Sequence, residues 1–297
     1  MAEISFGGIA EEELSQGEIK FTVFSAPYEV TASYIKGMAK GAEAILDAST
    51  HMELYDEELE IETFEHYGID TLDGPNLENL SPEEMVEAVQ KVSEEIIGKG
   101  TVPVLLGGDH SVTTGLFRAL KKKYSDLSVL HFDAHADLRD SYEGTPYNHA
   151  CTGRRIAEDG TKLVQVGIRS LSVEEGEYLK SDDSRNVKTY FAKDLKSRGV
   201  YFINIEEIRE FLTDNIFITI DLDVFDPSIM PATGTPEPGG LGWYEVLGTI
   251  KEVISGKNVV GFDCVELCPI EGLVAPDFMA AKLVYRIMGY IGVEGKE

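Results

Sequence analysis

Residues 133–137 read DAHAD, which places two carboxylates and one imidazole at alternate positions. If the backbone stays extended there, Asp133, His135 and Asp137 project to one side, and each is about 6–7 Å from the next along the strand. Imidazole and carboxylate ligands suit a hard or borderline divalent ion such as Mn²⁺, Zn²⁺ or Fe²⁺. The pattern predicts a metal site, although on its own it would also fit a solvated strand end.

Two other segments carry ligands of the same kinds. DLD at 221–223 supplies Asp221 and Asp223, and GGDHS at 107–111 supplies His110. Each segment alone could be an ordinary turn or helix cap. Together with DAHAD they offer four carboxylates and two imidazoles, more than one tetrahedral zinc needs. The set suits two five- or six-coordinate ions that share carboxylates, and such a pair activates a bridging water as hydroxide near neutral pH.

These ligands must be positioned by regular elements, and the chain has apolar, β-branched runs of strand length at 101–108, 127–133, 162–168, 215–223 and 258–266. Their hydrophobicity is continuous rather than alternating, which indicates strands buried on both faces of a parallel sheet. A helix should begin after Ser81, where Pro82 and Glu84 complete a capping box. Further helices are expected at 112–123, 205–213, 243–255 and 275–291.

Polar residues follow several of these runs, at the carboxyl end of each predicted strand. The segments are GGDH, HFDAHAD, DLDVFD and VELCP. Ligands of open α/β sheets bind beyond the carboxyl ends of the strands, so these side chains should share one edge. The chain contains no repeat, low-complexity tract or flexible linker. We therefore expect a single domain over residues 1–297, a three-layer α/β/α fold with a mainly parallel sheet.

The composition narrows the possible partners. The net charge is −27, from 26 Lys plus Arg against 53 Asp plus Glu, so the chain should repel nucleic acid and anionic lipid. It could attract cations, but solubility or adaptation to salt or heat would explain the charge equally well. No stretch reaches the roughly 20 apolar residues of a membrane span, and the N-terminus does not resemble a signal peptide, so a cytoplasmic location is expected. The thiols Cys151, Cys264 and Cys268 are expected to be reduced and packed in the interior.

Three segments resemble the signature motifs of the ureohydrolase family, which contains arginases and agmatinases: GGDHS at 107–111, DAHAD at 133–137 and DLDVFDP at 221–227. They stand in the family's order. The resemblance continues through PATGTPEPGGL at 231–241 and GFDCVELCP at 261–269, and more weakly through 26–45. Thr219 stands where the family usually has Ser, and the replacement retains a hydroxyl group. Among the members of the family, microbial agmatinases are the most similar, and the resemblance implies an arginase/deacetylase-like fold.

The resemblance also implies a ligand set. One manganese would be held by His110, Asp133, Asp137 and Asp221, and the other by Asp133, His135, Asp221 and Asp223. Asp133 and Asp221 would bridge the two Mn²⁺ ions. A hydroxide between the ions, hydrogen-bonded to Asp137, would attack the guanidinium carbon of the substrate and release urea and an amine.

Three more residues are candidates for catalysis or substrate binding. Glu266 ends an apolar run, and a carboxylate suits the planar donor fork of a guanidinium, the role that the family assigns there. His149 lies in the loop after DAHAD and, near its ordinary pKa, could pass a proton to the leaving amine. Thr235 matches a family threonine near the guanidinium. Glu266 could instead form a structural salt bridge, and His149 could make only a structural hydrogen bond. His51 and His66 are expected to be structural or solvated.

The part of the substrate away from the guanidinium should be recognised by the loop LRDSYEGTPYNH, in which Arg139 stands where an arginase has Asn. The absence of that Asn, with Asp140 and Glu143 nearby, favours a cationic tail, and agmatine hydrolysis to putrescine and urea is the first choice. N1-aminopropylagmatine is the nearest alternative. Guanidinobutyrate would be favoured if Arg139 faced the pocket, although a salt bridge to Asp140 or Glu143 is its simpler interpretation. Arginine remains a further alternative.

Two other classes of protein are compatible with parts of the pattern. A deacetylase on the same fold would use a single zinc with an Asp/His/Asp set, whereas His110 and Asp137 are extra ligands that favour two metals. A non-catalytic paralogue would be expected to have lost ligands, and all six are present. By resemblance the chain should form a homo-oligomer, a trimer or a hexamer.

Overall fold

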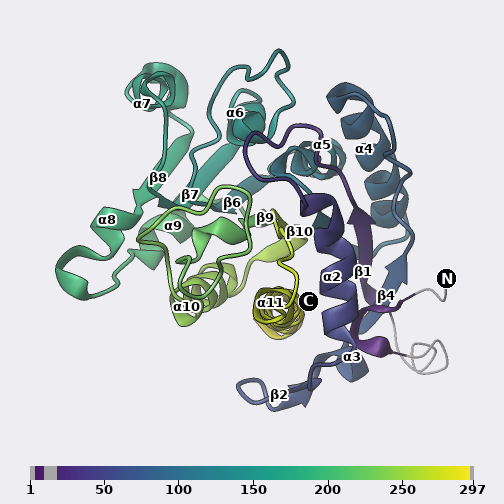
Figure 1. Ribbon diagram of the computed structural model, residues 1–297. Coiled ribbons are helices and arrows are strands. Elements are labelled where there is room, and N and C mark those ends of the chain that lie inside the picture. The colour runs from purple at the N-terminus through teal and green to yellow at the C-terminus, as the bar shows by residue number, and fades with distance from the viewer. Residues whose placement is uncertain (1–3, 10–18, 295–297) are drawn as a thin grey trace.

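One parallel sheet runs through the computed structural model, which describes residues 4–9 and 19–294. Its order is β4-β1-β5-β10-β9-β6-β7-β8, and each neighbouring pair is parallel (Figure 1). The strands are β1 (Ile19–Ala26), β4 (Gly68–Leu72), β5 (Val102–Gly107), β6 (Ser128–Phe132), β7 (Lys162–Ile168), β8 (Val187–Phe191), β9 (Asn215–Asp221) and β10 (Asn258–Val265). A separate antiparallel ladder joins β2 (Tyr55–Asp56) and β3 (Ile61–Glu62).

Helices cover both faces of the sheet. One apolar core lies under α4 (Pro82–Gly98), α5 (Thr113–Lys123), α6 (Thr152–Ala157) and α7 (Val173–Tyr178). The other lies under α2 (Gly41–Ser49), α8 (Ala192–Leu195), α9 (Ile205–Phe211), α10 (Trp243–Ile254) and α11 (Ala275–Glu294). The short α3 (Thr63–His66) lies beside α2 and α11 in Figure 1. The expected three-layer α/β/α fold is confirmed, and we propose that the chain forms a single domain.

The helix α4 has the start that its sequence predicts. The Ser81 hydroxyl accepts from the backbone N–H of Glu84 at 3.3 Å, and the Glu84 carboxylate accepts from the N–H of Ser81 at 2.9 Å. Packing of α4 on α5 requires a glycine at 115, because an added Cβ would lie 2.7 Å from the Cβ of Val89. In the part of the chain that the structure describes, no helix is long and apolar enough to cross a membrane.

The predicted strands and helices are confirmed to within a few residues at each end, apart from α11, which extends to Glu294. Sequence reasoning missed β1, β4 and β8. The edge strands β4 and β8 are only partly buried and mix polar with apolar residues, so they lack the continuous hydrophobicity of the inner strands.

The four strands that end in polar segments are adjacent in the centre of the sheet: β5, β10, β9 and β6. Their registers align Leu106 with Cys264, Cys264 with Ile220, and Ile220 with Phe132. The residues that follow this row therefore leave the sheet at the same level. Asp221 and Asp133 consequently emerge side by side at the carboxyl edge.

The DAHAD segment is not the extended strand that its alternation suggested. β6 ends at Phe132, and Asp137 adopts a left-handed backbone with φ 51°. His135 retains one parallel bridge, to Ser170. The one-sided alternation of Asp133, His135 and Asp137 was conditional on an extended backbone, and that condition is not met at Asp137.

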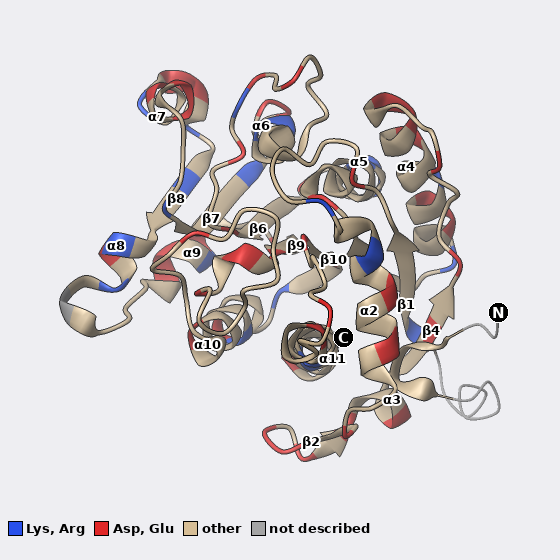
Figure 2. Ribbon diagram, in the orientation of Figure 1, with Lys and Arg blue, Asp and Glu red and all other residues tan. Residues whose placement is uncertain are grey.

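A buried ion-pair network ties α11 to the acidic segment that begins at β2, below α11 in Figure 2. The Arg286 Nε lies 2.6 Å from the Asp56 carboxylate, and its terminal nitrogens lie 2.8 Å from Glu57 and Glu58. Asp56 and Arg286 are 2% and 7% exposed. Lys251 reaches Glu58 at 2.9 Å from a more exposed position.

Replacement of Arg286 by Met should lower the free energy of unfolding by about 3–5 kcal/mol, because it leaves the buried Asp56 carboxylate without its counter-charge. Lys251→Met is the matched control and should cost about 0–1 kcal/mol, since its ion pair is solvated. Urea unfolding of the three proteins measures both values. Equal losses in the two variants would contradict the special role of the buried pair.

Candidate active site

The carboxyl edge of the sheet gathers all six predicted metal ligands. His110 begins a 3₁₀ turn after β5, and Asp133, His135 and Asp137 follow β6. Asp221 ends β9, and Asp223 lies in the 3₁₀ turn Leu222–Val224. Five of these side chains are buried, and His135 is about a quarter exposed.

The first group surrounds His110. Its Nδ1 lies 3.2 Å from Asp133 Oδ2, 3.2 Å from Asp137 Oδ2 and 3.5 Å from Asp221 Oδ2. This buried nitrogen has no hydrogen-bond partner of adequate geometry, whereas its Nε2 pairs with the Thr219 hydroxyl at 2.9 Å. Buried polar atoms are normally satisfied, so an orphaned imidazole nitrogen among three carboxylate oxygens fits a shared cation.

The second group surrounds His135. Its Nδ1 lies 2.9 Å from Asp223 Oδ2 and 3.6 Å from Asp133 Oδ1. Asp133 therefore turns one carboxylate oxygen toward each group, the arrangement that a bridging ligand needs. Asp221 uses its Oδ1 to accept the N–H of Asp223 at 2.8 Å, while its Oδ2 faces His110.

The electrostatics of the cluster favour bound cations. Burial, and then the charge of Asp133, raise the pKa of Asp137 to about 7, and burial with the charge of Asp223 raises the pKa of Asp221. Among the residues that the structure describes, no Lys or Arg forms an ion pair with the four ligand aspartates. Divalent ions would supply the missing positive charge and let the carboxylates ionise together.

Two residues of the site have unusual backbone geometry. Asp137 and Glu266 adopt φ 51° and 67°, values that residues other than glycine seldom take. The turn at Glu266 is held by its N–H, which donates to the carbonyl of Gly108 at 2.8 Å. Its Oε1 accepts the N–H of His110, also at 2.8 Å. Backbone strain of this kind concentrates at functional sites, where surrounding contacts maintain it.

A pocket of about 220 Å³ opens above the cluster, lined by His135, Asp137, Arg139, Tyr142, His149 and Thr235 among others. Glu266 lies beside the lining residue His149, with its Oε1 4.0 Å from His149 Nδ1. The structure thus brings Thr235, His149 and Glu266 to the ligand groups as the sequence predicts. Gly234 lies against Glu266, because a Cβ added there would be 3.4 Å from Glu266 Oε2 and 3.2 Å from the end of the Met38 side chain.

His149 does not keep an ordinary pKa, contrary to the expectation from sequence. Burial, and then the charges of His135 and His110, lower the pKa of His149 to about 4, so its imidazole is neutral at pH 7. The loop is held by the His149 N–H, which donates to the Thr31 hydroxyl at 3.1 Å. Thr31 in turn donates to the buried Asp109 carboxylate at 2.9 Å, a support that sequence reasoning missed.

Arg139 pairs with neither of the acids suggested for it. Its Nε lies 4.0 Å from Glu175, and its guanidinium lies 4.7 Å from the centre of the Tyr142 ring. Asp140 instead pairs with Arg155 at 3.1 Å. The Tyr142 ring then meets His149 edge-on, so Arg139 belongs to the wall of the pocket.

Sequence reasoning also missed His131, which precedes Asp133 by two residues within β6. Its Nε2 lies 2.7 Å from Asp133 Oδ2, and its side chain is fully buried. A histidine inside an otherwise apolar run was the available signal, because such residues are rarely buried without a partner. The free thiols Cys151, Cys264 and Cys268 are buried as expected, and His51 and His66 are exposed.

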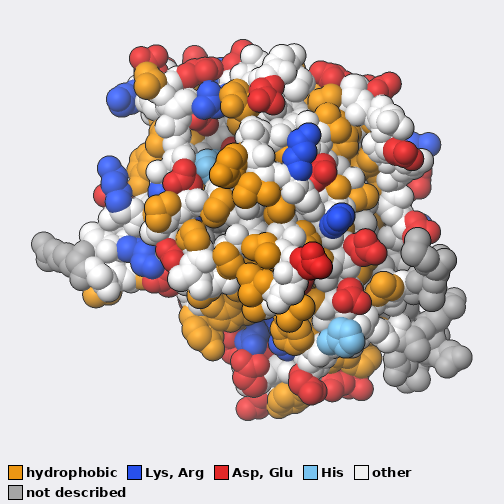
Figure 3. All heavy atoms as spheres, in the orientation of Figure 1, with side chains coloured by type: hydrophobic (Ala, Val, Ile, Leu, Met, Phe, Trp, Pro, Cys, Tyr) orange, Lys and Arg blue, Asp and Glu red, His pale blue; other side chains and the backbone are white. Residues whose placement is uncertain are grey.

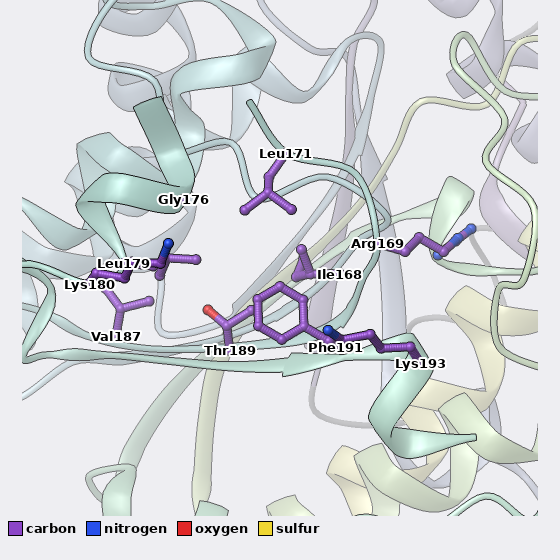
Figure 4. Close-up of a pocket in the computed structure, with 10 residues that line it drawn as sticks. All are labelled: Ile168, Arg169, Leu171, Gly176, Leu179, Lys180, Val187, Thr189, Phe191 and Lys193. Carbon is purple, nitrogen blue, oxygen red and sulfur yellow. The ribbon is translucent and has the colours of Figure 1, made fainter. Parts of the chain in front are cut away.

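A second cavity of about 600 Å³ lies between α7 and β8 at the edge of the sheet (Figure 4). Leu171, Leu179 and Phe191 give it an apolar lining beside Thr189, and Arg169 lies at its margin with the guanidinium pointing away (Figure 4). Arg169 also donates to the carbonyl of Asp223 at 2.6 Å and so braces the cluster from this side. Figure 3 shows basic side chains scattered singly over the face in view, with no basic patch there.

Comparison with known proteins identifies relatives that cover nearly the whole chain. The model of the arginase family matches residues 19–289. The N(1)-aminopropylagmatine ureohydrolase of Synechocystis is 38% identical over 95% of this chain and 92% of its own length. The agmatinase of Pyrococcus horikoshii is 33% identical over 93% of this chain and 95% of its own length.

A solved structure has the same architecture. The agmatine ureohydrolase of Thermoplasma volcanium superposes with a TM-score of 0.83 and 32% identity, over 98% of this chain and 94% of its own. Its fold, the motif order and the extent of the family match agree with one another. The chain therefore belongs to the arginase family, as a hydrolase of the ureohydrolase type that acts on guanidino groups and is similar to microbial agmatinases.

Proposed function

We propose that this guanidino hydrolase uses two Mn²⁺ ions to release urea from an agmatine-type amine. The observation that carries the proposal is the His110 Nδ1 atom, buried and unpartnered among three carboxylate oxygens, beside a second imidazole–carboxylate group. Both groups consist of nitrogen and oxygen donors, with no thiolate that would select a softer metal.

Each of the two groups of side chains, around His110 and around His135, is proposed to hold one ion. His110, Asp133, Asp137 and Asp221 would hold one ion, and Asp133, His135, Asp221 and Asp223 would hold the other. The distances from Asp133 to both histidines support its bridging role. Such a pair, when bound, supplies Lewis acidity and lowers the pKa of a bridging water so that it can act as the nucleophile.

Glu266 is proposed to orient the substrate. Its Oε1 already accepts the N–H of His110, which fixes the carboxylate at the base of the pocket. Its Oε2 faces Gly234, next to Thr235, where the planar guanidinium can lie against both. A carboxylate matches this donor fork in shape and charge, and Thr235 would add a polar contact beside it.

His149 and Asp137 are proposed to move protons. Asp137 lies in the first group and lines the pocket, so its carboxylate can accept a hydrogen bond from the attacking water. His149 is neutral at pH 7, and its Nε2 has no protein partner. This imidazole can take up a proton during the reaction and pass it to the departing amine.

The wall of the pocket favours an amine tail over a carboxylate. Arg139 is engaged by Glu175 and the Tyr142 ring, so it is not free to bind a substrate carboxylate in this arrangement. Agmatine is the substrate that the sequence favours first. The 38% identity to a protein named for N1-aminopropylagmatine, against 33% to a named agmatinase, favours the longer amine, and we propose N1-aminopropylagmatine as the preferred substrate and agmatine as the second.

The assembly and location remain proposals as well. A homo-oligomer, a trimer or a hexamer, is supported by large apolar side chains on the surface, among them Phe202, Tyr244 and Val274, each more than 70% exposed. A cytoplasmic location is supported by the three unpaired thiols.

Binding of Mn²⁺ should raise the free energy of unfolding, by about 2.7 kcal/mol at a free concentration 100 times the dissociation constant. Asp221→Asn should abolish most of this gain. The same variant should melt at or above the wild-type temperature without metal, because it removes one of several crowded buried charges.

Asp159→Asn, which alters an exposed aspartate, is the matched control and should behave as wild type. Melting curves with and without Mn²⁺ measure all three proteins. A wild-type protein that gains no stability from Mn²⁺, Zn²⁺, Co²⁺ or Fe²⁺ would contradict the metal centre. One tightly held zinc per chain would instead favour the single-zinc deacetylase class.

Substrate preference can be read from urea release by the Mn²⁺-loaded enzyme. We expect kcat/KM to be highest with N1-aminopropylagmatine and next highest with agmatine. Guanidinobutyrate and arginine should give lower values, because Arg139 is already engaged by Glu175 and the Tyr142 ring and is not free to bind their carboxylates. A preference for arginine or guanidinobutyrate would contradict the proposed tail pocket and leave the metal centre intact. Absence of urea from every guanidine would favour a non-catalytic paralogue.

Glu266→Gln should lower kcat/KM by roughly 100-fold, about 3 kcal/mol, because the guanidinium loses its ionic partner while Mn²⁺ binding persists. The exposed Glu271 provides the control variant Glu271→Gln, which should leave kcat/KM unchanged. Steady-state urea release gives both values. Unchanged kcat/KM in Glu266→Gln would overturn its assignment to the substrate.

A further inference from the structure

A row of polar side chains, buried except for the partly buried Thr189, crosses the sheet two residues before Asp133 and Asp221 in their strands. The strand registers align Thr189 with Gln165, Gln165 with His131, His131 with Thr219 and Thr219 with Asp263. Gln165, His131, Thr219 and Asp263 lie within apolar inner strands, where an unpaired polar group would be costly, and Thr189 lies in the partly buried edge strand β8. Two members touch the ligand groups directly, because Thr219 pairs with His110 and His131 pairs with Asp133.

The hydrogen-bond directions in this row can be worked out from Gln165. Its Nε2 lies 2.6 Å from the carbonyl of Ala136, which can only accept, and its Oε1 accepts the Thr189 hydroxyl at 3.0 Å. The Ala136 carbonyl therefore fixes the carboxamide orientation, and the Thr189 hydroxyl, which can donate or accept, is compatible with it. The same Nε2 lies 3.2 Å from His131 Nδ1, which must then accept.

The tautomer of His131 follows from this constraint. Because Nδ1 accepts from Gln165, the proton of the neutral imidazole resides on Nε2. That N–H donates to Asp133 Oδ2 at 2.7 Å. The other oxygen of the same carboxylate, Oδ1, accepts the N–H of His135 at 2.5 Å. The Asp133 carboxylate is thus held at both ends.

We propose that His131 is a positioning residue that holds Asp133 in the orientation that bridges the two ligand groups, with Gln165 setting the direction of its hydrogen bond. The inference rests on the metal centre of the proposed function. His131 and Gln165 are fully buried and do not line the pocket, so they act through Asp133 and not on the substrate. Groups that orient a metal ligand from behind commonly change metal affinity 10–100-fold when removed.

The test is Mn²⁺ binding to the metal-free, full-length chain, measured by calorimetry without substrate. His131→Phe keeps a flat ring but removes the donor, and Mn²⁺ should bind roughly 10–100-fold more weakly. His131→Gln carries an amide N–H near the position of Nε2, and its affinity should lie within about threefold of wild type. His131→Asn places its amide near Nδ1, too far from Asp133, and should resemble the Phe variant.

Unfolding of each metal-free variant separates positioning from packing. Weaker Mn²⁺ binding by the Phe and Asn variants, rescued in the Gln variant, supports the proposal whether or not stability changes. Equal affinity in all variants overturns it. Equal loss in Phe, Asn and Gln variants also overturns it, because that result indicates a packing role. If His131→Phe does not fold, the Asn–Gln pair gives the same comparison.

The tautomer can be tested independently by ¹⁵N NMR of the histidine rings in metal-free protein, with His131→Gln used to assign the signal. We expect the protonated nitrogen to be Nε2, and a signal from Nδ1–H would overturn the assigned direction. Failure of the proposed function is distinguishable, because a wild-type chain that binds no divalent metal rejects both proposals. A wild-type chain that binds Mn²⁺ with affinity indifferent to His131 rejects only this one.

Discussion

The structure depends on one electrostatic constraint, the burial of several carboxylates at a single edge of a parallel sheet. Asp133, Asp137, Asp221 and Asp223 lie within a cluster that has three imidazoles, those of His110, His131 and His135, but, among the described residues, no Lys or Arg paired with these acids. Burial removes most of their hydration, and this loss together with mutual repulsion raises the pKa values of Asp137 and Asp221. Divalent cations relieve it, and the metal chemistry proposed for the site follows from that need.

The fold satisfies this constraint through strand order. The strands β5, β10, β9 and β6 are far apart in sequence but adjacent in the sheet, so their carboxyl ends deliver ligands to one place. Beneath the ligands, the strands carry the polar row that includes His131 and Gln165. A sheet interior that would otherwise be wholly apolar thus provides directional hydrogen bonds, and these orient ligands more narrowly than packing alone.

Sequence reasoning anticipated the inner strands and the gathering of His110 and the acids at their carboxyl ends, because continuous apolar runs and acidic strand ends are local signals. It missed the edge strands, whose mixed composition resembles a loop. It did not anticipate the left-handed backbone at Asp137, which no local pattern indicates. The low pKa of His149 and the pairing of Arg139 with Glu175 depend on neighbours from distant segments, which no local pattern reveals.

We propose that the edge of the sheet holds a pair of divalent ions with Asp133 between them. Crystals grown with Mn²⁺ and measured at an X-ray wavelength where manganese scatters anomalously test it most directly. We expect two anomalous peaks roughly 3.5–4 Å apart, one beside His110 and one beside His135. A single peak, or none within the cluster, would contradict the account.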